Sequence, residues 1–68
     1  MVNTQMLRKK MKDAGVTQAR LAEKLGLAKA TVSQKMNNSR PMFLHEAEVI
    51  SEELNISDAE FKVYFFQH

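Results

Sequence analysis

Residues 17–37 read TQARLAEKLGLAKATVSQKMN, a stretch in which two short helical patterns meet at Gly26. Thr17 can cap the first helix, because its side-chain oxygen can accept a hydrogen bond from a backbone N–H two or three residues later. The apolar residues of this helix share one face, and they are Leu21, Ala22 and Leu25. Glycine adopts the left-handed conformation at no steric cost, so Gly26 is expected to end the helix. The pattern therefore predicts two helices joined by a sharp turn.

The second helix of this pair has distinct inner and outer faces. Val32 and Met36 are four residues apart and predict its buried side, while Leu27 is expected to fill the angle between the two helices. The outer face is polar and compact, and it consists of Lys29, Ala30, Ser33, Gln34 and Asn37. Two helices joined in this way form a helix-turn-helix, whose second helix fits the major groove of DNA.

Further helical patterns lie on both sides of this motif. Asn3 or Thr4 can cap a first helix, and Gly15 can end it. The inward residues of that helix are Met6, Leu7, Met11 and Ala14. A fourth helix is expected from about residue 42 to residue 54, although Phe43 stands where a polar cap is usual.

A last short helix is indicated by Ser57 and Glu60, a capping-box pattern in which each side chain can accept from the other's backbone N–H. All the elements then read as helical, which predicts a compact all-α fold of five helices. The chain has 68 residues and no cysteine, so we expect one domain spanning residues 1–68. Packing or dimerisation must supply its stability.

Charge is divided unevenly along the chain. Residues 1–40 carry nine Lys or Arg against two acids, a net of +7, whereas residues 41–68 carry one against six, a net of −5. A solvated surface of mixed sign is the simplest interpretation of such runs. The positive part coincides with the helix-turn-helix pattern, however, and a positive surface attracts phosphate backbones. The split therefore favours a nucleic acid as the partner.

Ordered segments from Leu7 to Ile56 resemble one family of regulators. The matching segments are Gly15-Val16-Thr17-Gln18, Leu21-Ala22, Leu25-Gly26-Leu27, Thr31-Val32-Ser33, Lys35-Met36-Asn37-Asn38 and Arg40-Pro41-Met42, with Ala47, Ile50, Leu54 and Ile56. In these segments the chain resembles the lambda-type Cro/cI (XRE-like) helix-turn-helix repressors of phages. The resemblance implies a lambda-repressor-like domain with the helix-turn-helix at helices 2 and 3.

The resemblance also implies which residues read bases. The positions aligned with the family's base-reading residues are Lys29, Ala30 and Gln34, with Ser33 alongside. Lys29 can donate to guanine O6 and N7, Gln34 can pair with adenine N6 and N7, and Ala30 offers a methyl surface to thymine. An ordinary solvated lysine is the alternative for Lys29.

Phosphate contacts are expected on both sides of that helix. The resemblance implies that Gln18, at the start of the supporting helix, holds a phosphate, and it implies the same for Asn37. Thr31 is a further candidate, and Arg40 is one by its charge, since Pro41 restricts it to extended geometry directed toward solvent. The alternative for Gln18 is an exposed glutamine without a role.

Two positions depart from the commonest family pattern. Ala28 precedes the second helix where serine or threonine is frequent, so the usual cap is absent. Arg20 replaces a frequent acidic residue, which removes any capping box from Thr17. The remaining cations Arg8, Lys10 and Lys35 are expected to contribute to the field rather than to make defined contacts, and the acidic run Glu46, Glu48, Glu52 and Glu53 is interpreted as a solvated helix face.

The aromatic tail, residues 61–68, holds four of the chain's five aromatic residues. One interpretation is a dimer interface formed by Tyr64, Phe65 and Phe66, which would set two recognition helices about 34 Å apart on a near-palindromic operator. The other is that Phe61 and Phe65 close the bottom of the core. We expect both to hold in part, with Phe61 in the core and Tyr64 or Phe66 in the interface.

Other functions lack the residues that they require. His45-Glu46 has no second histidine at metal-site spacing, and no cysteine nucleophile or glycine-rich phosphate loop exists, so we expect neither an enzyme nor a cofactor. No apolar run approaches the roughly 20 residues of a membrane span. The prediction is a cytoplasmic, nucleoid-associated regulator that binds operator DNA as a homodimer, without a small-molecule ligand. The alternative is a protein-binding module, an antirepressor or antitoxin, which captures a partner through the aromatic tail.

Overall fold

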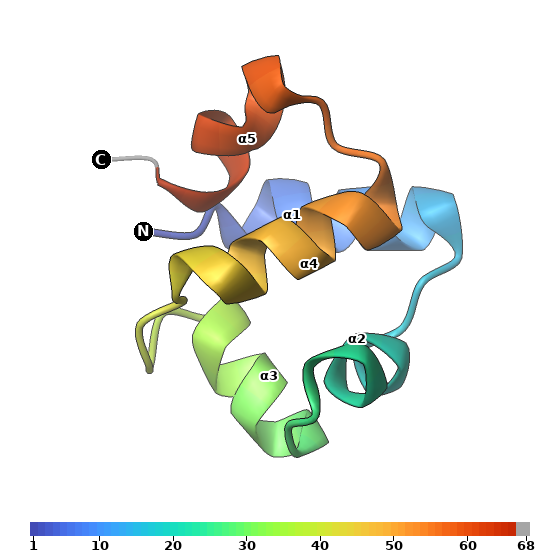
Figure 1. Cartoon of the computed structure of the whole chain (residues 1–68), viewed down its shortest axis with the longest axis vertical. Coiled ribbons are helices and arrows are strands. Elements are labelled where there is room, and N and C mark those ends of the chain that lie inside the picture. The colour runs from blue at the N-terminus through green and yellow to red at the C-terminus, as the bar shows by residue number, and fades with distance from the viewer. Residues whose placement is uncertain (67–68) are drawn as a thin grey trace.

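The computed structural model describes residues 1–66, and five helices account for most of them. In chain order they are α1 (Thr4–Ala14), α2 (Gln18–Leu25), α3 (Lys29–Met36), α4 (Leu44–Leu54) and α5 (Asp58–Phe65). Figure 1 shows α2 and α3 at one end of the molecule, α5 at the other, and α1 and α4 crossing the middle. The all-α prediction is confirmed. The last two residues of the predicted aromatic tail, 67 and 68, lie outside the described residues.

The first two helices begin and end as the sequence predicts. The Asn3 side chain caps α1 by accepting from the Met6 backbone N–H, and the Thr17 hydroxyl oxygen caps α2 by accepting from the Arg20 N–H at 3.2 Å. Gly26 ends α2 with a φ of +67°, in the left-handed region that favours glycine. These caps fix the length of each helix and therefore the direction in which the chain leaves it.

The starts of α4 and α5 differ in detail from the sequence expectations. Helix α4 begins at Leu44, and Phe43 precedes it without an acceptor of its own, but the Glu46 carboxylate accepts from the Phe43 N–H at 2.9 Å. At α5, the Ser57 hydroxyl donates to the Glu60 carboxylate at 3.0 Å. The expected reciprocal capping box is therefore not formed, because these two side chains bond each other and not the backbone N–H groups.

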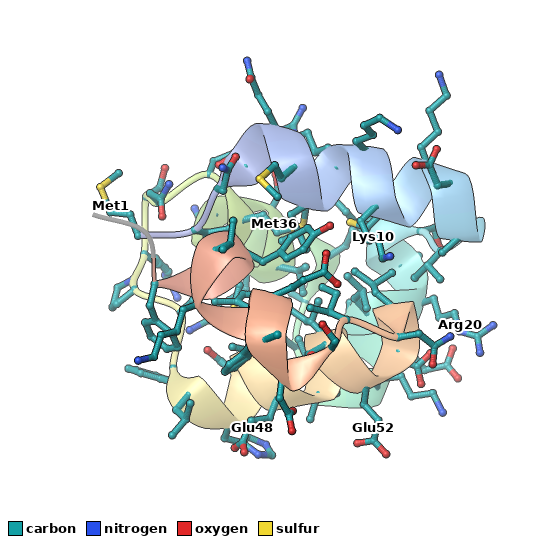
Figure 2. All side chains as sticks on the ribbon, turned by 90° about the horizontal axis from the view of Figure 1, so that it is seen from above. Met1, Lys10, Arg20, Met36, Glu48 and Glu52 are labelled. Carbon is teal, nitrogen blue, oxygen red and sulfur yellow. The ribbon has the colours of Figure 1, made fainter. Side chains whose placement is uncertain are left out.

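The hydrophobic core draws residues from every helix. Its buried members include Leu7, Leu21, Ala22, Val32, Met36, Ala47, Ile50 and Leu54. Figure 2 shows Met36 inside the molecule, between the ribbons. Val32 and Met36 occupy the buried side of α3, and Leu27 packs partly buried against the core, as predicted. The core therefore holds α3 by one side and leaves the other side to solvent.

Two aromatic residues of α5 belong to this core. Tyr64 is 7% exposed and Phe65 only 2%, and Phe61 packs against them with its ring centroid 5.0 Å from that of Phe65. Their burial within one chain differs from the expectation that Tyr64 and Phe65 lie in a dimer interface. The physical reason for this burial is that α5 packs against α1 and closes the core. Of the three residues, only Phe66 remains exposed.

The N-terminal segment joins α5 to the end of α3. The Asn3 backbone N–H donates to the Tyr64 carbonyl at 2.7 Å. Two residues beyond α3, the Asn38 side chain accepts from the Val2 N–H at 2.9 Å and donates to the Val2 carbonyl at 3.0 Å. Val2 itself is buried. This segment therefore holds the loop that follows α3 from one side.

Candidate nucleic-acid interface

The turn between α2 and α3 sets the orientation of α3. After Gly26, the Leu27 N–H donates to the Ala22 carbonyl at 3.0 Å, which turns the chain back across α2. Ala22 is buried where the two helices pack, and Val32 lies on the α3 side of the same core. A small residue at this position allows α2 and α3 to pack closely, so α2 holds α3 firmly in place.

The polar side of α3 forms one exposed row. Lys29, Ala30 and Gln34 are exposed, and Ser33 beside them is half-buried. Within residues 1–66, the side chains of Lys29 and Gln34 form neither a hydrogen bond nor an ion pair with the protein. The four predicted base-reading residues are thus brought together on one face, where the side-chain polar groups of Lys29 and Gln34 are available to an external partner.

The start of α3 carries no side-chain cap. Ala28 has the extended dihedrals of a capping residue, with φ −69° and ψ 147°, but its methyl group cannot accept a hydrogen bond. The first N–H groups of a helix lack acceptors inside the helix, so those of α3 have no side-chain partner at this position. The absence of a cap inferred from the sequence is confirmed.

Asn37, a predicted phosphate contact, is tied to two helices. Its Oδ1 accepts from Arg8 Nη2 at 2.9 Å, and its Nδ2 donates to Ser33 Oγ at 3.4 Å. Arg8 was expected to act only through its field, so its bond to Asn37 is a contact that the sequence interpretation missed. The signal was weak, because 29 residues separate the two in the chain.

The loop after α3 presents Arg40 to solvent. The backbone N–H groups of Ser39 and Arg40 both donate to the Gln34 carbonyl, at 2.8 and 3.2 Å. This arrangement fixes the backbone of the loop against the last turn of α3, while the Arg40 side chain is exposed. The two remaining phosphate candidates are placed differently, since Gln18 begins α2 and is half-buried and Thr31 is half-buried on α3.

Lys35 and Glu46 form a buried ion pair, which corrects two expectations. Lys35 is 6% exposed and Glu46 8%, and Lys35 Nζ lies 3.0 Å from Glu46 Oε1. Lys35 therefore does not act as a free surface cation, and Glu46 does not belong to a solvated face. The sequence signal for the burial of Lys35 was its position: it follows Val32 by three residues and precedes Met36 by one, so it lies near the buried side of α3.

Glu53 pairs with two cations of α2. Its carboxylate oxygens lie 3.1 Å from Arg20 Nε and 3.6 Å from Lys24 Nζ. This pairing gives Arg20 a partner inside the molecule and joins α2 to α4. Glu48 and Glu52 are exposed and project outward from α4 in Figure 2, as expected of a solvated face. The acidic run is thus solvated only in part.

The fold and the exposed face of α3 together define a helix-turn-helix DNA-binding domain. The family model of the Cro/C1-type helix-turn-helix DNA-binding domain matches residues 6–66, and the chain belongs to this family. Comparisons with curated proteins and with solved structures find no significant match. Within residues 1–66, none of the helices has the length and apolar character needed to cross a membrane.

Proposed function

We propose that the protein is a sequence-specific transcriptional regulator, a Cro-like or short repressor of phage or mobile-element origin. It binds operator DNA through the major groove, at the nucleoid in the cytoplasm, and blocks promoter access. The observation that carries this proposal is the exposed row of Lys29, Ala30 and Gln34 on α3, supported from behind by the buried Val32 and Met36. A rigid helix with free polar groups is what reading of base edges requires.

The proposed contacts divide into base reading and phosphate binding. Lys29 donates to guanine, Gln34 pairs with adenine, and Ala30 contacts a thymine methyl group, with Ser33 beside them. The phosphate contacts come from Gln18, Thr31, Asn37 and Arg40. Phosphate contacts fix position without reading sequence, so the two groups predict different responses to substitution.

Selection of bound duplexes from a random pool, followed by binding measurements on the selected site, tests this division. Lys29→Ala and Gln34→Ala should each relax preference at particular base pairs by roughly 1 to 3 kcal/mol. Arg40→Ala should weaken binding to all duplexes alike and reduce its salt dependence. Lys12→Ala removes an exposed cation from the last turn of α1 and serves as a charge control. Equal loss on every sequence for Lys29→Ala would contradict base reading.

The dimer is proposed to form at the flank where α3 ends. This flank carries the exposed apolar side chains of Phe43 and Leu44. Beside them lies a pocket of about 430 Å³ that is lined in part by Met1, Pro41 and Phe66. In Figure 1 the N-terminus, the end of α5 and the α3–α4 loop gather on one side of the molecule. A two-fold axis on this side would place two α3 helices on the same face of an operator.

Sedimentation of the wild-type protein and of a Leu44→Ser variant, each with and without the selected duplex, tests the dimer. We expect two chains per duplex for the wild type, on an inverted repeat, and weaker or single occupancy for the variant. Val63→Ser changes an exposed apolar residue on α5 and is the matched control. One wild-type chain per duplex, on a site without symmetry, would argue against this arrangement.

The same apolar flank favours one other candidate, a protein-binding module of the antirepressor or antitoxin kind. Phe43 and Leu44 are 60% and 57% exposed next to each other, and exposed apolar patches often mark protein–protein interaction sites. Size-exclusion chromatography with and without duplex, at low and moderate salt, separates the two functions. A module of this kind would show little affinity for any duplex, whereas the proposed regulator forms a complex that weakens with salt.

A further inference from the structure

A buried ammonium group connects α3, the α3–α4 loop and α4. Lys35 Nζ lies 3.0 Å from Glu46 Oε1, donates to the Pro41 carbonyl at 3.1 Å, and lies 4.4 Å from the centroid of the Phe43 ring. An ammonium group has three donors and no acceptor, so two oxygens and an aromatic face satisfy it well. Glu46 completes the cluster because it also accepts from the Phe43 N–H.

A buried ion pair is weak evidence for a contribution to stability. Taking two charges out of water is expensive, and replacing a buried ion pair by apolar residues of similar size is often neutral or stabilising. Lys35 and Glu46 are each more than nine-tenths buried, so this comparison applies to them. An apolar pair could not form the directed hydrogen bonds that Lys35 makes to the Pro41 carbonyl and Glu46 makes with the Phe43 N–H.

Those bonds act on the loop that carries a proposed phosphate contact. Lys35 holds the Pro41 carbonyl, and the Gln34 carbonyl holds the N–H groups of Ser39 and Arg40. Arg40 is therefore fixed by its backbone on both sides, while its side chain is free in solvent. The backbone position determines which phosphate the guanidinium group can reach.

We propose that Lys35, held by Glu46, is a positioning residue for DNA binding: it sets the α3–α4 loop so that Arg40 meets the phosphate backbone. Lys35 itself touches no DNA in this arrangement. The inference rests on the proposed DNA-binding function, and it adds a second layer of residues behind the phosphate contacts. It also assigns a role to the acidic partner Glu46, a residue of the negatively charged part of the sequence.

The test is a double-mutant cycle between Lys35→Met and Arg40→Ala, measured as affinity for the selected duplex over a range of salt. Lys35→Met should weaken binding several-fold and lower the slope of log affinity against log salt by about 0.9, the value of one phosphate contact on duplex DNA. In the Arg40→Ala background the same change should have little further effect. Far-UV circular dichroism establishes that each variant is folded at the temperature used.

Two further variants keep the test decisive. Lys35→Met leaves Glu46 unpaired and could unfold the domain, so the double replacement Lys35→Met with Glu46→Met restores an apolar core without directed bonds. That variant should be folded yet bind with the reduced salt slope. Lys9→Met breaks the exposed Lys9–Asp13 pair, with the same change in charge, and should leave the slope nearly unchanged.

Each outcome decides for or against the inference. A folded Lys35→Met, Glu46→Met protein with wild-type affinity and slope would overturn it, as would losses from Lys35→Met and Arg40→Ala that simply add. Those results leave the proposed function intact, because the wild type still binds its operator. Failure of the wild type to bind any duplex would overturn the proposed function and this inference together.

Discussion

The uncapped start of α3 offers a direct test of how this domain is stabilised. Ala28 already has capping dihedrals and is exposed, so Ala28→Ser places a hydroxyl oxygen where it can accept from the N–H of Ala30 or Thr31 without displacing a neighbour. A serine cap is worth about 1 kcal/mol relative to alanine, within a range of about 0.5 to 2. For a domain of this size that gain corresponds to a rise in Tm of about 4–8 °C.

Thermal unfolding followed by far-UV circular dichroism measures the gain, with urea unfolding as an independent estimate of its free energy. Ala19→Ser is the matched control, because it adds the same hydroxyl to an exposed alanine in the first turn of α2, which Thr17 already caps. Serine is a weaker helix former than alanine, so the control should lower stability by a few tenths of a kcal/mol. An unchanged Tm for Ala28→Ser, or an equal rise in both variants, would refute the capping argument.

Three further outcomes are expected from the turn and from the surface ion pairs. Gly26→Ala should lower the free energy of unfolding by about 1–2 kcal/mol through backbone strain alone, since nothing lies within 4 Å of the added methyl group; a urea midpoint equal to that of the wild type would contradict this. Arg20→Ala should cost less than about 1 kcal/mol, because Arg20 is exposed and Glu53 keeps Lys24 as a second partner, and the difference should shrink in 1 M salt. The hydrogen bond from Lys9 lowers the pKa of Asp13, so this pair's contribution is present at neutral pH and is lost as pH falls through that lowered value; Lys9→Met should return the Asp13 pKa, followed by NMR, to its ordinary range.

The parts of the fold that depend on local chemistry could be predicted from the sequence. Thr17 marks the start of α2 and Gly26 its end, because a hydroxyl cap and a left-handed glycine act within a few residues. Val32 and Met36 are buried because helical spacing places them on one side of α3. The exposure of Lys29 follows from the same spacing, so the placement of the candidate site could be predicted as well.

The parts that depend on neighbours distant in sequence could not be predicted. Charge alone classed Lys35 and Glu46 as solvated, and only the approach of α4 to the end of α3 shows that they are buried together. Aromatic density placed Tyr64 and Phe65 at an interface, but a single α5 packed against α1 is sufficient to bury them. Such residues are defined by tertiary packing, which local patterns do not contain.

Because the Asn3 N–H donates to the Tyr64 carbonyl, we expect the N-terminal segment and the last turn of α5 to open together. Opening of the last turn of α5 should then also break the two hydrogen bonds between the Val2 backbone and the Asn38 side chain. Amide hydrogen exchange at Asn3 should therefore respond to substitutions in α5, although the two are distant in sequence.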